Sequence, residues 1–216
     1  MFINIHTHQF HNSNAWSLIN LSHDFKSTLP QYNYSMGIHP KFIEASTFEN
    51  DFDNLKLASR QKNILAIGEC GLDRLSEVPL TLQERVFVLH VRWANEIAKP
   101  IIIHCVKAFP EVFKILKSCK NNMPVIFHGF NNNINIADQI IKEGYYVSFG
   151  KSLLHPNQEN IFNHIPSDRF FLENDDSDIA ISKIYEQAAR IRNTSVEQIS
   201  STIQKNLFRI FNNTQF

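Results

Sequence analysis

The sequence begins Met1-Phe2-Ile3-Asn4-Ile5-His6-Thr7-His8-Gln9-Phe10. Its apolar residues predict a short strand, and alternate residues of a strand point to the same face, so His6 and His8 share one face. Two imidazoles in this arrangement can clamp one metal ion. An isolated pair is more often one buried histidine and one surface histidine, so a metal site needs further ligands from other strands.

Seven further apolar runs of strand length follow this stretch, mostly separated by segments with helical spacing. The run Ile101-Ile102-Ile103-His104 is typical of a strand buried on both faces of a parallel sheet. The last helix is expected to open with a capping box of Thr194 and Glu197. The expected later strands are 15–21, 34–40, 64–68, 101–104, 124–128, 145–150 and 169–173. The expected helices are 48–61, 81–99, 110–119, 135–143, 161–165, 179–192 and 195–211.

This alternation predicts an α/β protein, and a (β/α)8 TIM barrel describes it better than an open sheet. About 250 residues is typical of the fold and about 200 is near its lower limit, so a chain of 216 residues makes a compact barrel. Residues 11–16 are too few for a helix with its loops, and 22–33 hold at most one helical turn. We therefore expect one domain, 1–216, with trimmed early helices.

Composition restricts the partners and the compartment. Lys plus Arg equals Asp plus Glu at 21 each, so no global field draws in nucleic acid. We find no apolar run near the roughly 18 residues of a membrane span and no secretion signal, so we expect a cytoplasmic protein without a membrane partner. Three cysteines fit a reduced compartment, and Cys70 and Cys105 are interpreted as packing residues.

Polar residues recur where the expected strands end, which is where the active site of such a barrel lies. Eight histidines and carboxylates lie at these ends. Four histidines and two carboxylates from among them are already too many ligands for one tetrahedral ion, and such a set fits two divalent ions that share a bridging carboxylate. Ligands rich in imidazole favour Zn²⁺, although metal supply can make the ion Mg²⁺ or Mn²⁺. The strand-end residues are His6, His8, His39, Glu69, His104, His128, Glu173 and Asp175.

Seven segments together resemble the TatD-like metal-dependent hydrolases, the TatD-type deoxyribonucleases of the amidohydrolase superfamily. The block Ala-Ile-Gly-Glu-Cys-Gly-Leu-Asp at 66–73 is the most specific of them. The others, in the same order as in the family, are 5–8, 37–40, 100–104, 127–130, 144–150 and 172–175. The resemblance covers essentially the whole chain, and it implies a TIM barrel that acts as a deoxyribonuclease.

Carried over by position, the resemblance implies a ligand set for two ions. One ion would be bound by His6, His8, Glu69 and Asp175, and the other by Glu69, His104 and His128. Glu69 would therefore bridge the two ions. Gln83 and Phe87 match a further family pattern and are interpreted as packing around the site.

The chain also departs from the family pattern. Asn4 stands where the family commonly has Asp, and Asn174 stands where it has Thr. Lys107 follows His104 in a block that usually carries an arginine, so it is a candidate phosphate contact, acting as a point charge. Arg74 is a weaker candidate of the same kind. His39 and Asp73 are expected beside the site, contacting the substrate or the metal ligands.

The resulting hypothesis is hydrolysis of a phosphodiester by an activated hydroxide, with Asp175 and Glu69 as catalytic residues. Because net charge is zero, DNA ends or short oligonucleotides are favoured as substrate over a long duplex. No obligate protein partner is indicated. Two alternatives stay open: an ester or amide hydrolase of the same superfamily, and a catalytically weak barrel that binds metal.

Overall fold

The structure is a computed structural model that describes residues 1–10, 15–22, 25 and 28–211. The chain divides into two compact units, each described here by itself. The first unit comprises Met1–Ile19 and Ile126–Phe216, and the second comprises Asn20–Val125. The expectation of a single domain over 1–216 stays a prediction.

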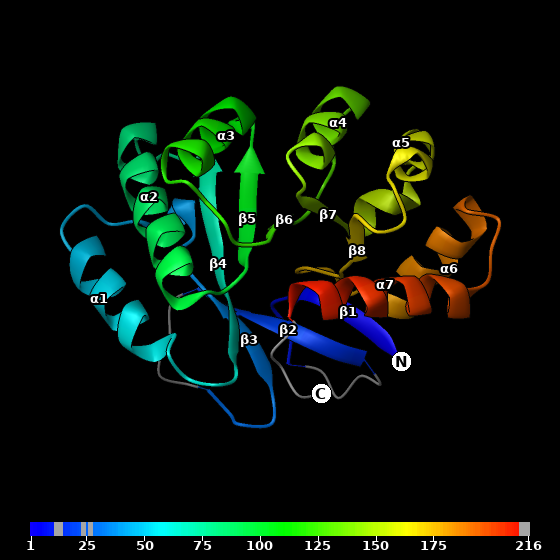
Figure 1. Cartoon of the computed structure of the whole chain (residues 1–216), viewed down its shortest axis with the longest axis horizontal. Coiled ribbons are helices and arrows are strands. Elements are labelled where there is room, and N and C mark those ends of the chain that lie inside the picture. Colours follow the sequence, from blue (N-terminus) through cyan, green and yellow to red (C-terminus); the bar gives the residue numbers. More distant parts are fainter. Residues whose placement is uncertain (11–14, 23–24, 26–27, 212–216) are drawn as a thin grey trace. The chain divides into compact units, whose positions relative to one another are not determined.

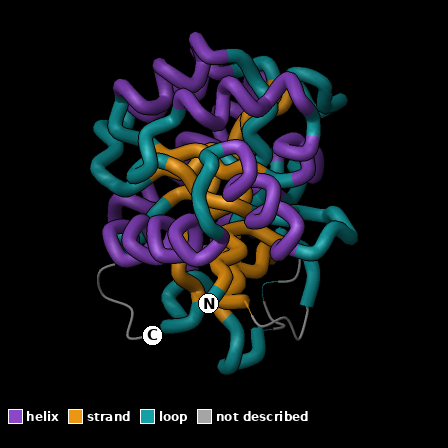
Figure 2. Tube along the Cα trace, turned by 90° about the vertical axis from the view of Figure 1, so that its right-hand side faces the viewer, coloured by secondary structure: helices purple, strands orange, loops and turns teal. Residues whose placement is uncertain are grey.

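Eight strands form one sheet, and their order in the sheet is their order in the chain. The pairs with a recorded register, such as β4 with β5 and β7 with β8, are parallel. The strands are β1 (Phe2–Thr7), β2 (Ala15–Leu21), β3 (Asn33–Met36), β4 (Ile64–Asp73), β5 (Ile101–Val106), β6 (Val125–Phe127), β7 (Tyr146–Phe149) and β8 (Phe170–Leu172). Figure 1 labels them, and Figure 2 distinguishes strands from helices by colour along the Cα trace.

Every helix expected from the sequence is present, with ends shifted by at most three residues. The α-helices are α1 (Phe48–Ala58), α2 (Leu80–Ile97), α3 (Phe109–Ser118), α4 (Ile134–Lys142), α5 (Glu159–His164), α6 (Ile181–Ile191) and α7 (Val196–Ile210). Short 3₁₀ turns are η1 (Pro40–Phe42), η2 (Lys151–Leu154) and η3 (Pro156–Gln158). None of the helices in the described part of the chain is long and apolar enough to cross a membrane. The short connections expected around 11–16 and 22–33 lie partly outside the described residues.

Three local expectations are wrong. The third strand ends at Met36 instead of Pro40, because Pro40 has a fixed φ and no N–H and instead begins η1. The fourth strand continues to Asp73, so Glu69 lies inside β4 and not at its end. The capping box of α7 is formed by Ser195 and Gln198 instead of Thr194 and Glu197, because the helix begins one residue later than expected.

In the first unit, α6 fixes the position of β1. The Tyr185 hydroxyl accepts a hydrogen bond from the Ile3 N–H and donates one to the Ile3 carbonyl, each at 3.0 Å. The phenol ring is fully buried, so both bonds are shielded from water. These two bonds hold β1, the strand that carries His6, through the backbone of Ile3.

In the second unit, two glycines let β5 approach β4 closely around Glu69. A Cβ on Gly68 would lie 2.2 Å from the Ile102 carbonyl oxygen, and one on Gly71 would lie 2.1 Å from the His104 carbonyl oxygen. Both glycines also have positive φ angles, 129° and 143°, which L side chains rarely adopt. Only glycine fits at these two positions, and they set the path of the backbone on either side of Glu69.

His90 of α2 holds the segment that follows β3. Its Nε2 accepts a hydrogen bond from the Ile38 N–H at 3.0 Å, so its Nδ1 carries the proton that is donated to the Val86 carbonyl at 2.8 Å. Burial of the ring lowers the pKa of His90 from 6.5 to about 4, against the raising effect of the bond to Val86. The neutral imidazole therefore positions the residue immediately before His39.

This pKa predicts how stability depends on pH. Between pH 6.5 and about pH 4, His90 binds a proton in the unfolded chain but stays neutral in the folded chain. Above pH 6.5, His90 therefore does not lower the free energy of unfolding. As the pH falls from 6.5 to about 4, His90 lowers that free energy by up to about 3 kcal/mol. Urea denaturation of the wild type and of His90→Gln should show a flatter pH dependence in the variant. Parallel curves would contradict the assignment.

Candidate metal centre

His6, His8 and Asp175 form a compact group in the first unit, here called the β1/β8 cluster. The Oδ1 atom of Asp175 lies 3.4 Å from Nε2 of His6 and 3.5 Å from Nε2 of His8. The His6 side chain is fully buried, whereas 37% of His8 and 29% of Asp175 are exposed. The cluster therefore has a buried side and a side open to solvent.

Backbone pairing between the end of β1 and the segment after β8 builds this cluster. Thr7 forms a parallel bridge with Asp175. The His8 N–H donates to the Asp175 carbonyl, and the Asp175 N–H donates to the His6 carbonyl, each at 3.1 Å. Asp175 has a φ of 54°, in the left-handed region that aspartate tolerates better than most residues. The aspartate is thus presented to both histidines by a turn of its own backbone.

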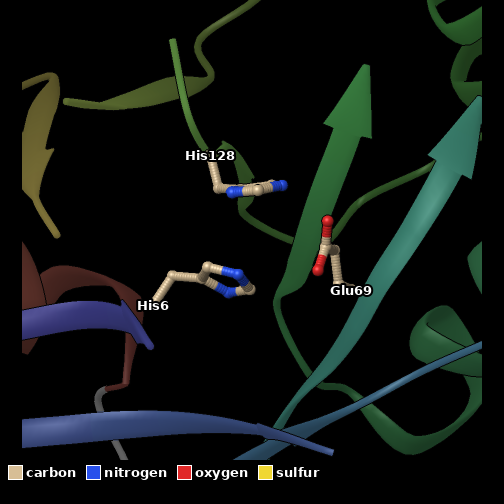
Figure 3. Close-up of side chains that lie close together, drawn as sticks. All are labelled: His6, Glu69 and His128. Atoms are coloured by element: carbon tan, nitrogen blue, oxygen red, sulfur yellow. The ribbon is translucent and has the colours of Figure 1, made fainter. Parts of the chain in front are cut away.

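His128, which follows β6, lies in the same unit and packs against His6. Their ring centroids are 4.2 Å apart, and Figure 3 shows the two imidazoles side by side. The Nδ1 atom of His128 lies 3.5 Å from Oε1 of Glu173, which also accepts the Gly129 N–H at 2.7 Å. Ligand atoms of His128, Glu173 and Asp175 all lie within 4.8 Å of one another. Glu173 is fully buried, so its charge needs these partners.

The second unit holds a separate group of His39, Glu69 and His104, here called the β4/β5 cluster. Oε1 of Glu69 lies 2.8 Å from Nδ1 of His104 and 3.3 Å from Nε2 of His39. The two imidazole rings are 4.4 Å apart. Glu69 is 2% exposed, and Figure 3 shows its carboxylate projecting from β4.

Asn20 of β2 fixes the orientation of the Glu69 carboxylate. Its Nδ2 donates to Oε2 of Glu69 at 3.2 Å, and its Oδ1 accepts the Glu69 N–H at 2.9 Å. Sequence reasoning missed this residue. The available signal was a polar side chain inside the apolar run Leu18-Ile19-Asn20-Leu21.

Asp73 contacts the Nε2 side of the His104 ring. Its Oδ2 atom lies 3.3 Å from Nε2 of His104 and 3.3 Å from Nζ of Lys41. Burial opposes ionisation of Asp73, but hydrogen bonds from the Leu75 N–H, His104 and Lys41 outweigh it and hold its pKa below the usual value. The two ring nitrogens of His104 therefore each face a carboxylate, Nδ1 that of Glu69 and Nε2 that of Asp73.

Gln83 of α2 supports the same corner of the second unit. Its Oε1 accepts the Asp73 N–H at 2.8 Å, and its Nε2 donates to the Asp73 carbonyl at 3.0 Å. Gln83 is 1% exposed, as is Phe87. The expectation that these two residues pack around the site agrees with this geometry.

The donor atoms suit a metal ion. Zn²⁺ bound to imidazole nitrogen and carboxylate oxygen at about 2.1 Å in tetrahedral geometry separates its ligands by about 3.4 Å. The His6–Asp175, His8–Asp175 and His39–Glu69 distances of 3.4, 3.5 and 3.3 Å match that value. A cation bound at Nδ1 of His104, which lies 2.8 Å from the Glu69 carboxylate, would leave Nε2 to donate to Asp73.

The remaining candidates are placed as follows. His39, expected beside the site, lies at ligand distance from Glu69. Lys107 is exposed just after β5. Arg74 pairs with Glu111 at 2.6 Å. Their roles as phosphate contacts stay predictions. Lys41, which no motif indicated, contacts the Asp73 carboxylate that also contacts His104.

The two cysteines near the site match their interpretation as packing residues. Cys70 is fully buried, and desolvation raises the pKa of its thiol well above the usual value, with Glu69 adding to the effect. Burial also raises the pKa of Cys105 to about 12. A thiol that stays protonated is a poor nucleophile and a poor metal ligand.

Asn4 and Asn174, the two departures from the family pattern, bond to each other. Nδ2 of Asn4 donates to Oδ1 of Asn174 at 2.7 Å, and Oδ1 of Asn4 accepts the Asn174 N–H at 3.1 Å. Both side chains are buried, at 4% and 6% exposed. The pair links residues two positions before His6 and one before Asp175, so it braces the β1/β8 cluster.

We expect this pair to behave as a unit. Asn4→Ala leaves buried groups of Asn174 unsatisfied and should lower the free energy of unfolding by about 1–3 kcal/mol and metal affinity by about 10–100-fold. Asn4→Ala combined with Asn174→Ala should cost clearly less than the sum of the two single variants. Urea denaturation and metal titration measure both effects. Asn54→Ala, at an exposed position of α1, is the control, and simple additivity would contradict the coupling.

Comparison with known proteins bears on the family of this chain and on the arrangement of its strands. A family model described as TatD related DNase matches residues 3–212. A protein named as the metal-dependent hydrolase YabD, from Bacillus subtilis, is 29% identical over 195 residues, which is 82% of this chain and 76% of that protein. A protein named as the metal-dependent hydrolase YcfH, from Escherichia coli K12, is 24% identical over 196 residues, covering 82% and 73%.

Solved structures share the fold. The TatD homolog YjjV from Escherichia coli K12 matches with a TM-score of 0.84 at 15% identity, covering 99% of this chain and 98% of that one. A TatD family hydrolase from Entamoeba histolytica matches with a TM-score of 0.82 at 17% identity and the same coverage. The predicted (β/α)8 barrel is confirmed, and because the family model spans nearly the full chain, the protein belongs to the TatD related DNase family.

Proposed function

We propose that this protein is a metal-dependent hydrolase that cleaves phosphodiesters, acting as a deoxyribonuclease on DNA ends or short oligonucleotides. The observation that carries the proposal is the pair of imidazole–carboxylate clusters, in each of which the ligand atoms lie within 4.8 Å of one another. Family membership and the names of the relatives as metal-dependent hydrolases support it.

The proposed ligands follow the sequence prediction. His6, His8 and Asp175 hold one ion, and Glu69 with His104 contributes to the other, with His128 as a further ligand. That Glu69 joins both sets stays a prediction from the sequence. A bound divalent ion lowers the pKa of its water and stabilises negative charge on a phosphoryl oxygen, which is the chemistry that phosphodiester hydrolysis needs.

The protein's own residues have distinct tasks in this proposal. Asp175 is 29% exposed and lies on the open side of its cluster, so its carboxylate can accept a proton from the attacking water. Asn20 keeps the Glu69 carboxylate in one orientation through two hydrogen bonds. Asp73 holds the His104 ring through Nε2 and leaves Nδ1 directed at Glu69.

The substrate preference rests on charge. With 21 basic and 21 acidic residues, the chain lacks the excess of Lys and Arg that neutralises many phosphates along a duplex. A substrate held mainly at its end needs only local contacts with the metal ions and a few cations. Short single strands and frayed ends meet that condition.

Metal removal is the first test. Protein treated with a chelator should lose hydrolysis of a labelled short single-stranded DNA, and Zn²⁺, Mn²⁺ or Mg²⁺ added back singly should restore it. Elemental analysis of protein purified without added metal identifies the native ion and its stoichiometry. Ester and amide substrates assayed on the same sample decide whether another bond is the true target. Bound metal without turnover of any substrate would favour a metal-binding barrel.

Isosteric removal of the two carboxylates is the second test. Glu69→Gln and Asp175→Asn should each lower kcat by about 10²–10⁴-fold while retaining the fold, and each should reduce bound metal. Glu186→Gln, an exposed change on α6, is the matched control and should leave both quantities unchanged. Wild-type activity in pure Glu69→Gln would show that the proposed role of this carboxylate is wrong.

A further inference from the structure

We propose that Phe42, together with the hollow beside it, forms a nucleobase subsite next to the β4/β5 cluster. This inference rests on the proposed function, because it names where one nucleotide of the substrate lies. It assigns a specificity role to a residue outside the metal ligands. The ligand class is a nucleoside phosphate unit of a short single strand.

Phe42 is exposed although it stands close to the candidate metal ligands. It closes η1, three residues after His39, and its ring centroid lies 5.3 Å from the His39 imidazole at an interplanar angle of 48°. The residue is 54% exposed, and in the described part of the chain only Phe10 and Phe208 are comparably exposed phenylalanines. The exposed part of this ring can therefore stack with a nucleobase.

A hollow of about 930 Å³ lies beside Phe42 within the second unit. This volume falls in the range of small-molecule sites. Phe25, Ile38 and Leu57 supply apolar lining, and Asn54 and Gln61 supply amide groups that can donate to a base. Glu44 and Asp51 also line the hollow, and their carboxylates can accept hydrogen bonds from the amino groups of a base. The lining thus combines a face for stacking with groups for hydrogen bonding.

Lys41 adds the charge that a nucleotide needs. Its side chain is 51% exposed, and its Nζ lies 3.3 Å from the Asp73 carboxylate that also contacts His104. The four-residue segment 39–42 therefore carries a histidine of the cluster (His39), a cation (Lys41) and an exposed aromatic ring (Phe42). A phosphate held at the cluster would have Lys41 beside it and Phe42 within reach of its base. Stacking on an aromatic ring accepts any base, which suits a nuclease without sequence preference.

The test compares two short single-stranded substrates that differ only by the presence or absence of the base beside the scissile phosphate. Wild-type protein should prefer the base-bearing substrate, and Phe42→Leu should reduce that preference in kcat/KM by about 5–100-fold, mainly through KM. Phe42→Trp should retain it. Phe208→Leu is the matched control, since Phe208 of α7 has the same exposure of 54%.

A binding measurement separates failure of this inference from failure of the proposed function. Fluorescence of 2-aminopurine deoxynucleoside 5′-phosphate should be quenched by the wild type and Phe42→Trp, and much less by Phe42→Leu. If the wild type cleaves neither DNA substrate, the proposed function fails, and quenching that depends on Phe42 would still support the subsite. Equal quenching, or an equal base preference, in the wild type and Phe42→Leu would overturn it.

Discussion

The close approach of β5 to β4 is the constraint on which the β4/β5 cluster depends. Gly68 and Gly71 leave no room for a Cβ beside the carbonyls of β5, so the backbone on both sides of Glu69 has little freedom. The buried carboxylate would be costly if its partners were displaced, because an ionised group in a low-dielectric interior needs compensation on all sides. Asn20 supplies that compensation on one oxygen, and imidazoles surround the other. Backbone geometry and electrostatics therefore reinforce each other at this position.

Different interactions hold the β1/β8 cluster together. There the ligands are brought together by backbone hydrogen bonds between the end of β1 and the segment after β8, and the Asn4–Asn174 pair braces that junction from within. Both clusters use imidazole and carboxylate donors. The β1/β8 cluster is supported by main-chain hydrogen bonds and by the Asn4–Asn174 hydrogen bonds, whereas the β4/β5 cluster is supported by the close strand contact that Gly68 and Gly71 allow. A mutation that disturbs one cluster should therefore leave the supporting contacts of the other intact, since the two clusters depend on different residues.

Sequence reasoning recovered the strands and the helices, because apolar periodicity is a local property, and it named the histidines and carboxylates that form the two clusters. It ended the fourth strand at Gly68, whereas pairing with β5 continues the strand to Asp73. It missed Asn20 and Lys41 because their importance lies in contacts with residues 49 and 32 positions away, respectively, which no local pattern encodes. The role of Lys107 rests on the family pattern alone, and the Arg74–Glu111 pair shows that Arg74 already has an anionic partner.

The left-handed backbone of Asp175 limits which amino acids can occupy this position over evolutionary time. A side chain there must offer an oxygen or nitrogen donor to the histidines and must also tolerate a φ of 54°, which excludes β-branched residues and disfavours longer ones such as glutamate. Glycine would relax the backbone but has no donor. Aspartate, asparagine and histidine are the residues that meet both demands, and of these only aspartate carries a negative charge. Sequence drift at this position is therefore restricted by conformation as well as by chemistry.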